Sequence, residues 1–100
     1  MTIKEKREGD VVQLFVEGRV DTTNAGDFQT AILTAFQKGS TVVIDMKDLA
    51  YISSAGLRAL LIGQKTANSK GGVQKLINVG ELVMELLQAT GFTDILTIES

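Results

Sequence analysis

The sequence predicts one α/β domain in which a mixed, mostly parallel β-sheet packs against helices. The chain has 100 residues, of which 44% are hydrophobic, enough for one core but not for two independent domains. Segments in which apolar and polar residues alternate are interleaved with segments whose apolar residues recur at helical spacing. The resulting element order is ββαβαβαβ, and each strand–helix–strand step favours a right-handed parallel crossover.

The N-terminal segment predicts a β-hairpin. Ile3–Arg7 and Val11–Glu17 flank a turn that contains Gly9, and apolar and polar residues alternate along the second segment. A glycine between two such runs is typical of a tight turn. We therefore expect the first two elements to be antiparallel strands.

Helical periodicity follows the hairpin. The apolar residues at helical spacing are Phe28, Ala31, Ile32, Ala35 and Phe36. Thr23 or Asn24 is placed to cap the start of this helix, and Gly39 to end it. Thr41–Met46 is then almost continuously apolar or β-branched, which predicts a central strand covered on both faces.

The C-terminal half predicts two more helices and two more strands. Each helix shows an apolar stripe and is followed by glycine, which commonly ends helices. The predicted elements are a helix from Ser54 or Ala55 to Lys70, a strand over Val73–Val79, a helix over Glu81–Thr90 closed by Gly91, and a short strand over Ile95–Ile98.

The composition excludes several classes of function. The sequence has no His and no Cys, which removes thiolate and imidazole catalysis and the common zinc sites. Its net charge is -2 and its pI is near 5.0, so the overall charge offers no attraction to nucleic acid or anionic membrane, although a local basic face could still exist. Apolar runs are far shorter than the ~20 residues of a membrane span. We expect a cytoplasmic protein that makes no direct contact with nucleic acid, does not insert into membranes and needs no metal or other cofactor.

Two carboxylates follow the predicted central strand and allow two interpretations. Asp45 and Asp48 could belong to a metal site or include a phospho-acceptor, although hard cations usually need more oxygen ligands. Alternatively, Asp48 closes a turn and Asp45 accepts hydrogen bonds from local backbone, which is the interpretation we favour. Neither common glycine-rich phosphate loop occurs, so nucleotide binding by this chain is not expected.

Small residues gather where the helix after the central strand begins: Ser53, Ser54, Ala55 and Gly56. The first N–H groups of a helix have no intrahelical partner and carry partial positive charge, which suits a phosphate. A phosphate on Ser54 would change the surface without disturbing the core. The alternative is that Ser53 or Ser54 serves only as the N-cap, the commonest role of serine at this position.

Four features occur in a fixed order along the chain. They are Gly18-Arg19-Val20-Asp21 with Ala25 and Phe28, then Val43-Ile44-Asp45 leading into Ile52-Ser53-Ser54-Ala55-Gly56-Leu57, then Asn78-Val79, then Thr90-Gly91-Phe92. Together they resemble the anti-sigma-factor antagonists, the bacterial members of the STAS (sulfate transporter and anti-sigma-factor antagonist) domain superfamily. The resemblance covers nearly the whole chain and implies one STAS domain over residues 1–100.

The resemblance also implies a function. In this family the unphosphorylated antagonist binds an anti-sigma factor that is also a serine kinase and holds the ATP site, and the sigma factor is thereby released. Phosphorylation of the antagonist breaks the contact, and a serine phosphatase resets it. The matching acceptor in this sequence is Ser54, and the chain itself needs no catalytic activity. Ser53 stands where family members commonly have Asp, and it is the alternative acceptor.

If the fold follows the family, the partner surface combines the loop after the second strand with the start and exposed flank of the helix that carries Ser54. The residues expected there are Asp21, Thr22, Thr23, Asn24, Ser53, Ser54, Ala55, Gly56 and Arg58. Gly56 is also suited to close packing, and Leu57, Leu60 and Leu61 are expected in the core because they share the apolar stripe.

Two alternatives remain at this point. The same domain could be a constitutive scaffold in a stress-signalling assembly, or an accessory subunit of a lipid or anion transport complex, without a phosphorylation switch. It could also be a receiver-like or hydrolytic enzyme, since fold does not determine function. The sequence argues against the enzymes, because only Asp21 follows the first parallel strand and a serine hydrolase would have no base.

Overall fold

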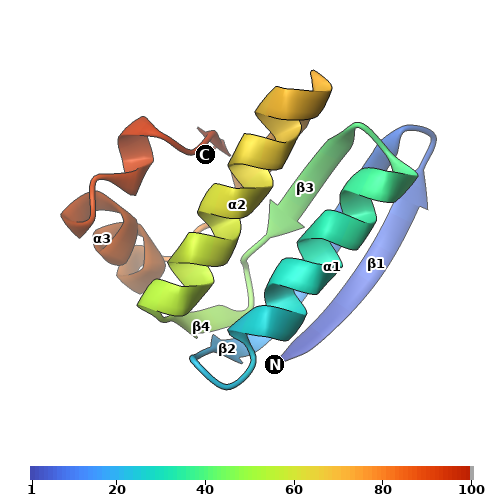
Figure 1. The fold of residues 1–100 in the computed structure, drawn as a ribbon. Helices are drawn as coiled ribbons and strands as arrows, with labels where there is room; N and C mark the ends of the chain where they lie inside the picture. Colours follow the sequence, from blue (N-terminus) through green and yellow to red (C-terminus); the bar gives the residue numbers. More distant parts are fainter. Residues whose placement is uncertain (100) are drawn as a thin grey trace.

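The computed structural model describes residues 1–99 and shows one α/β domain (Figure 1). The elements in chain order are β1 (Thr2–Glu8), β2 (Val11–Val20), α1 (Ala25–Lys38), β3 (Thr41–Asp45), β4 (Leu49–Ile52), α2 (Ser54–Lys70), β5 (Val73–Ile77), α3 (Glu81–Ala89), the 3-10 helix η1 (Phe92–Asp94) and β6 (Ile98–Glu99).

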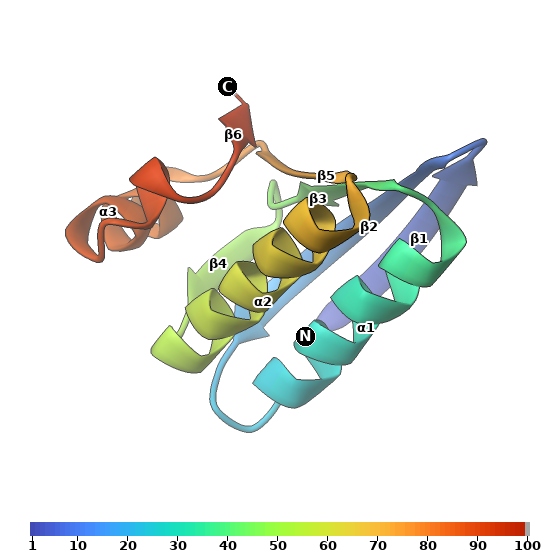
Figure 2. The same cartoon turned by 45° about the horizontal axis from the view of Figure 1, so that its top comes forward.

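The sheet is mixed and mostly parallel, as predicted. Its strand order is β1-β2-β3-β5-β6, and β4 pairs with β2 beyond the end of β3. β1 is antiparallel to β2, and the other pairs are parallel. Helices α1 and α2 pack side by side on one face of the sheet, while α3 lies against β4 (Figure 2). The opposite face of the sheet has no helix over it in these views.

The predicted element order is roughly correct, but one strand is missing from it and the last strand is displaced. No strand is predicted between Asp45 and Ser54, whereas the structure has β4 there. At only four residues, β4 is too short to show a clear alternation. The predicted strand over Ile95–Ile98 is also displaced: η1 occupies Phe92–Asp94, and β6 begins at Ile98. Ile95 is 51% exposed, because the chain is still turning there and has not reached the sheet.

The core lies between the sheet and the two helices on its covered face. Val12, Leu14 and Val16 of β2 are buried, whereas the residues between them are half-buried on the opposite face. On α1 the predicted stripe is buried, except that Ala31 is half-buried. Leu57 and Leu60 of α2 are in the core, as predicted, and Leu61 is half-buried.

Gly39 ends α1 for a different reason from the usual left-handed glycine cap. Its backbone is extended, at φ -161°, a conformation that any residue adopts. A Cβ at Gly39 would lie 2.5 Å from the Asp10 carbonyl oxygen, so only glycine allows the end of α1 to approach the β1–β2 turn. Gly71, by contrast, ends α2 in the left-handed region, at φ 68°.

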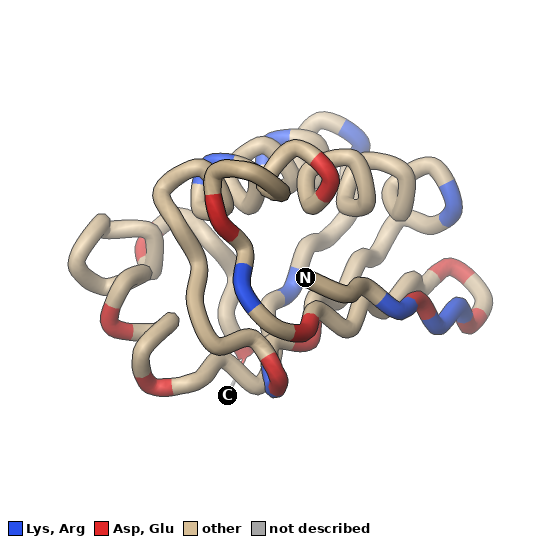
Figure 3. The backbone as a smooth tube through the Cα atoms, turned by 90° about the horizontal axis from the view of Figure 1, so that it is seen from below, with Lys and Arg blue, Asp and Glu red and all other residues tan. Residues whose placement is uncertain are grey.

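Charged residues are distributed with both signs interspersed along the chain (Figure 3). In β1 and the turn that follows it, Lys4, Lys6 and Arg7 are interleaved with acidic residues. Lys4 pairs with Glu17 across the hairpin at 3.4 Å, and such exposed pairs contribute little to stability. None of the helices in residues 1–99 is long and apolar enough to cross a membrane.

Candidate functional site at the start of helix α2

The pairing of β2 with β4 brings the two segments predicted to form the site together. Val20 pairs with Ile52, and the backbone N–H of Ser53 donates to the Val20 carbonyl at 2.8 Å. The loop at 21–24 follows β2 directly, and α2 begins at Ser54, directly after Ser53. β4, which is not predicted from the sequence, is therefore the element that positions the candidate site.

Ser53 and Ser54 have different environments. Ser53 is only 9% exposed, and it is the N-cap of α2: its Oγ accepts from the Gly56 N–H at 3.2 Å. Its carbonyl accepts from the Leu57 N–H at 2.9 Å. Ser54 is exposed in the first turn of the helix. The pair therefore divides into a structural serine and a surface serine.

The 21–24 loop is held by its own side chains. One carboxylate oxygen of Asp21 accepts from the Thr23 hydroxyl at 2.6 Å and from the Thr23 and Asn24 N–H groups at 3.0 and 3.3 Å. The hydroxyl bond from Thr23 is the main reason that the pKa of Asp21 lies below its ordinary value; the two N–H bonds and the nearby Arg19 act in the same direction. Thr22 and Thr23 are exposed.

Asn24 occupies the N-cap position of α1, one of the two positions predicted, but its side chain does not cap the helix. Instead, its Oδ1 accepts from the Asp21 N–H at 2.9 Å, and its Nδ2 donates to the Arg19 carbonyl at 3.0 Å. These bonds hold the loop against the end of β2. Asp21 contributes through its backbone as well, because its carbonyl accepts from the Ala25 N–H at 2.9 Å.

Gly56 takes part in the site through packing. It is buried, and a Cβ there would lie 2.5 Å from Cγ1 of Ile52 and 2.8 Å from Cγ1 of Val20. Glycine at this position therefore lets the start of α2 lie close to the ends of β2 and β4. Ala55 is half-buried and Arg58 is exposed, so the surface of this part of α2 comes from its outward side chains.

One neighbouring pair was not found from the sequence. The Arg19 guanidinium lies over the Tyr51 ring, 4.5 Å from its centroid, and the two residues are partners in the β2–β4 pairing. They lie opposite to the buried Val20 and Ile52, which face the helices. Recognition of β4 as a strand would have revealed the contact, because cross-strand partners on one face adjoin.

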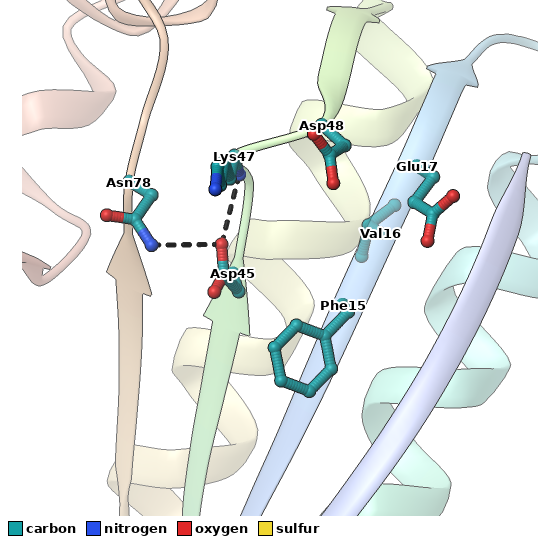
Figure 4. Close-up of a pocket in the computed structure, with 7 residues that line it drawn as sticks. All are labelled: Phe15, Val16, Glu17, Asp45, Lys47, Asp48 and Asn78. Carbon is teal, nitrogen blue, oxygen red and sulfur yellow. Dashed lines mark hydrogen bonds between the residues drawn. The ribbon is translucent and has the colours of Figure 1, made fainter.

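Asp45 and Asp48 line a separate pocket with a volume of about 370 Å³ (Figure 4). Asp45 Oδ1 accepts from the Lys47 N–H at 3.0 Å and from Asn78 Nδ2 at 3.1 Å, while Gln13 donates to Oδ2 at 3.4 Å. This confirms the structural interpretation of Asp45. Within residues 1–99 no three acidic residues are grouped as metal ligands. The backbone carbonyl of Asp48 accepts from the Gly18 N–H at 3.0 Å.

The fold defines a class of small α/β domain in which two helices cover one face of a mostly parallel sheet. The sequence profile of the STAS domain family matches residues 2–100. The chain therefore belongs to the STAS domain family, which confirms the resemblance stated from the motifs.

Several similar proteins are named as anti-sigma factor antagonists. The anti-sigma-B factor antagonist of Bacillus subtilis is 26% identical over 100 residues, covering 100% of this chain and 92% of the relative. BtrV of Bordetella bronchiseptica, a candidate anti-sigma factor antagonist, is 32% identical over 84 residues, covering 83% of this chain and 72% of the relative. A crystal structure of a candidate anti-sigma factor antagonist from Thermotoga maritima gives a TM-score of 0.89 at 25% identity, covering 98% of this chain and 86% of that one.

Proposed function

We propose that this chain is an anti-sigma factor antagonist whose binding is switched by phosphorylation of Ser54. Unphosphorylated, it binds an anti-sigma factor that is also a serine kinase, so that the sigma factor is released. The kinase transfers the γ-phosphoryl group of ATP to the Ser54 hydroxyl, which loses its proton, and ADP leaves. A serine phosphatase returns the hydroxyl by hydrolysis of the phosphate ester.

The observation that carries the proposal is the contrast between the two serines. A kinase needs a hydroxyl that it can reach, and Ser54 is exposed. Ser53 is buried and its Oγ caps α2, so its modification would require the first turn of the helix to open. This contrast favours Ser54 over Ser53. The names of the relatives support an anti-sigma factor as the partner.

The proposed partner surface surrounds Ser54. Its exposed part comprises Thr22, Thr23, Ser54 and Arg58, with Asp21, Asn24 and Ala55 half-buried beside them. A surface of this kind is preorganised, since the Asp21 and Asn24 hydrogen bonds hold the loop in one shape, and preorganisation reduces the entropy lost on binding.

Phosphorylation would act on the interface and leave the fold intact. It adds a charge of about -1.5 to -2 at neutral pH, at a position where the first turn of α2 has no acidic residue to repel it. A partner surface that fits a neutral hydroxyl would have to desolvate that charge, which costs several kcal/mol. Because each ~1.4 kcal/mol is a tenfold change in affinity, this is enough to end binding.

The test begins with phosphopeptide mapping after incubation with ATP and host extract. Wild type, Ser53→Ala and Ser54→Ala are compared, and a known substrate confirms that the extract contains active kinase. We expect the phosphate to disappear only in Ser54→Ala. Loss only in Ser53→Ala would overturn the choice of residue. No phosphate in any sample would favour a scaffold or transport-complex subunit without the switch.

The second test measures the affinity for the kinase that the first test identifies. Ser54→Ala should bind as wild type does, and Ser54→Asp should bind at least about tenfold more weakly, because it places a negative charge in the interface. Ser69 is an exposed serine near the other end of α2, and Ser69→Asp is the matched control, which should bind normally. Equal affinities of Ser54→Ala and Ser54→Asp would contradict the switch.

A further inference from the structure

Arg58 and Ser54 occupy the same exposed side of α2. They are four residues apart on one helix, a spacing that places two Cβ atoms about 5–6 Å from each other. Both side chains are exposed, whereas Gly56 and Leu57 between them are buried against the domain. The two side chains therefore project from one solvent-facing stripe, one helical turn apart.

Arg58 has no charged partner within the described part of the chain. The ion pairs in residues 1–99 are Lys4–Glu17, Lys38–Glu5 and Lys75–Glu99. The first turn of α2 contains no acidic residue, so none competes there for the guanidinium. In the 21–24 loop, the Asp21 carboxylate already accepts hydrogen bonds from Thr23 and Asn24. The guanidinium is thus free to pair with an anion at position 54.

We propose that Arg58 is the charge partner of the phosphoryl group on Ser54. The inference rests on the proposed function, since it requires Ser54 to be the phosphorylated residue. A guanidinium offers a planar set of N–H donors that matches phosphate oxygens in pairs, and the spacing of one turn allows the contact without any movement of the backbone.

The pairing gives the phosphorylated state two effects at the partner surface. The phosphate adds negative charge, and it also draws Arg58 onto its own helix, away from a partner that contacts the free guanidinium in the unphosphorylated state. Substitution of Arg58 should therefore weaken binding of the unphosphorylated chain and, separately, destabilise the doubly ionised phosphate. The second effect can be measured without any partner.

The test uses the full chain with phosphoserine inserted at position 54 during translation, so it needs no kinase. The ³¹P chemical shift is followed from about pH 5 to about pH 8 at low salt, across the second ionisation of the phosphate near pH 6. The samples are the phosphorylated chain with Arg58 intact, with Arg58→Gln, with Arg58→Lys, and with Lys65→Gln as the matched control for loss of another exposed cation on α2. Circular dichroism confirms that each sample is folded.

Arg58→Gln should raise the midpoint of the titration by about 0.3 pH unit, because removal of the cation disfavours the dianion. Arg58→Lys should recover part of that change, and Lys65→Gln should leave the midpoint where it is. Equal midpoints in Arg58→Gln and Lys65→Gln would overturn the inference. Since the phosphate is installed directly, this result is independent of the mapping experiment, whose failure alone would remove the proposed function.

Discussion

The ends of β2 and β4 and the ends of β3 and β5 both carry polar side chains, but the two regions use them differently. At β3 and β5 the carboxylate of Asp45 accepts hydrogen bonds from Lys47, Asn78 and Gln13, so its hydrogen-bonding capacity is satisfied within the protein. At β2 and β4 the internal bonds involve Asp21, Asn24 and Ser53, and the hydroxyl of Ser54 remains exposed.

The comparison shows that a polar residue at the end of a strand is not by itself evidence of a binding site. From the sequence, Asp45 with Asp48 and Ser53 with Ser54 were comparable candidates. In the structure, Asp45 is only 9% exposed and fully engaged, whereas Ser54 is exposed beside a serine that already caps the helix. What distinguishes a candidate site is whether a reactive group remains exposed once the hydrogen bonds that hold the fold have been made.

The largest loss of stability should follow from disrupting the packing of α2 against the ends of β2 and β4. Gly56→Val should destabilise the domain by about 3 kcal/mol, because a side chain there collides with Ile52 and Val20. Urea unfolding measures the change. Gly26→Ala is the control: it lies in α1 with nothing within 4 Å of an added Cβ, so it should be neutral or stabilising. Equal stability of Gly56→Val and wild type would contradict the close approach.

A smaller loss of stability is expected at the ends of β3 and β5, where Asp45 has a structural role. Asp45→Ala leaves the amides of Lys47, Asn78 and Gln13 without their acceptor and should cost about 1–3 kcal/mol of stability, with no loss of affinity for the proposed kinase partner. Asp48→Ala is the matched control, because Asp48 is exposed; it should change stability by less than about 0.5 kcal/mol. If Asp45→Ala were stable but failed to bind the partner, the division between the two regions would be wrong.

The smallest expected effect is a pH dependence of the unfolding free energy that arises from Asp21 in the 21–24 loop. Hydrogen bonds, chiefly from the Thr23 hydroxyl, hold the pKa of Asp21 below its ordinary value in the folded state. The carboxylate therefore stabilises the fold above its unfolded pKa of about 3.9, and this contribution is lost as pH falls through the lower folded pKa. The difference in unfolding free energy between wild type and Asp21→Asn should shrink between about pH 5 and about pH 3. A constant difference would contradict the assigned bonds.

Much of the architecture could be predicted because it follows from local periodicity. The stripe that contains Phe28 and Ile32, the alternation along β2 and the near-continuous apolar run of β3 each report which faces must be buried. These patterns gave the helices, the mixed sheet and the first four elements in their correct order. The motifs around Asp21 and Ser54 were likewise readable, because they are short and contiguous.

Other features depended on contacts between distant segments. β4 exists because Leu49–Ile52 meets the far end of β2, and four residues carry too little periodicity to show it. β6 is displaced because pairing with β5 begins only at Ile98. The stacking of Arg19 on Tyr51 and the need for glycine at positions 39 and 56 likewise arise from surfaces that meet only in the folded chain.

The two serines separate what the sequence determined from what the tertiary structure decided. The sequence by itself placed a serine pair among small residues at a helix start, which is enough to identify a candidate site and its family resemblance. It could not choose between the two hydroxyls, because a shift of one residue in the helix start exchanges their roles. The Ser53 N–H bond to Val20 sets the end of β4, and the Ser53 hydroxyl bond to Gly56 sets the first residue of α2. Tertiary pairing therefore buries Ser53 and leaves Ser54 on the surface.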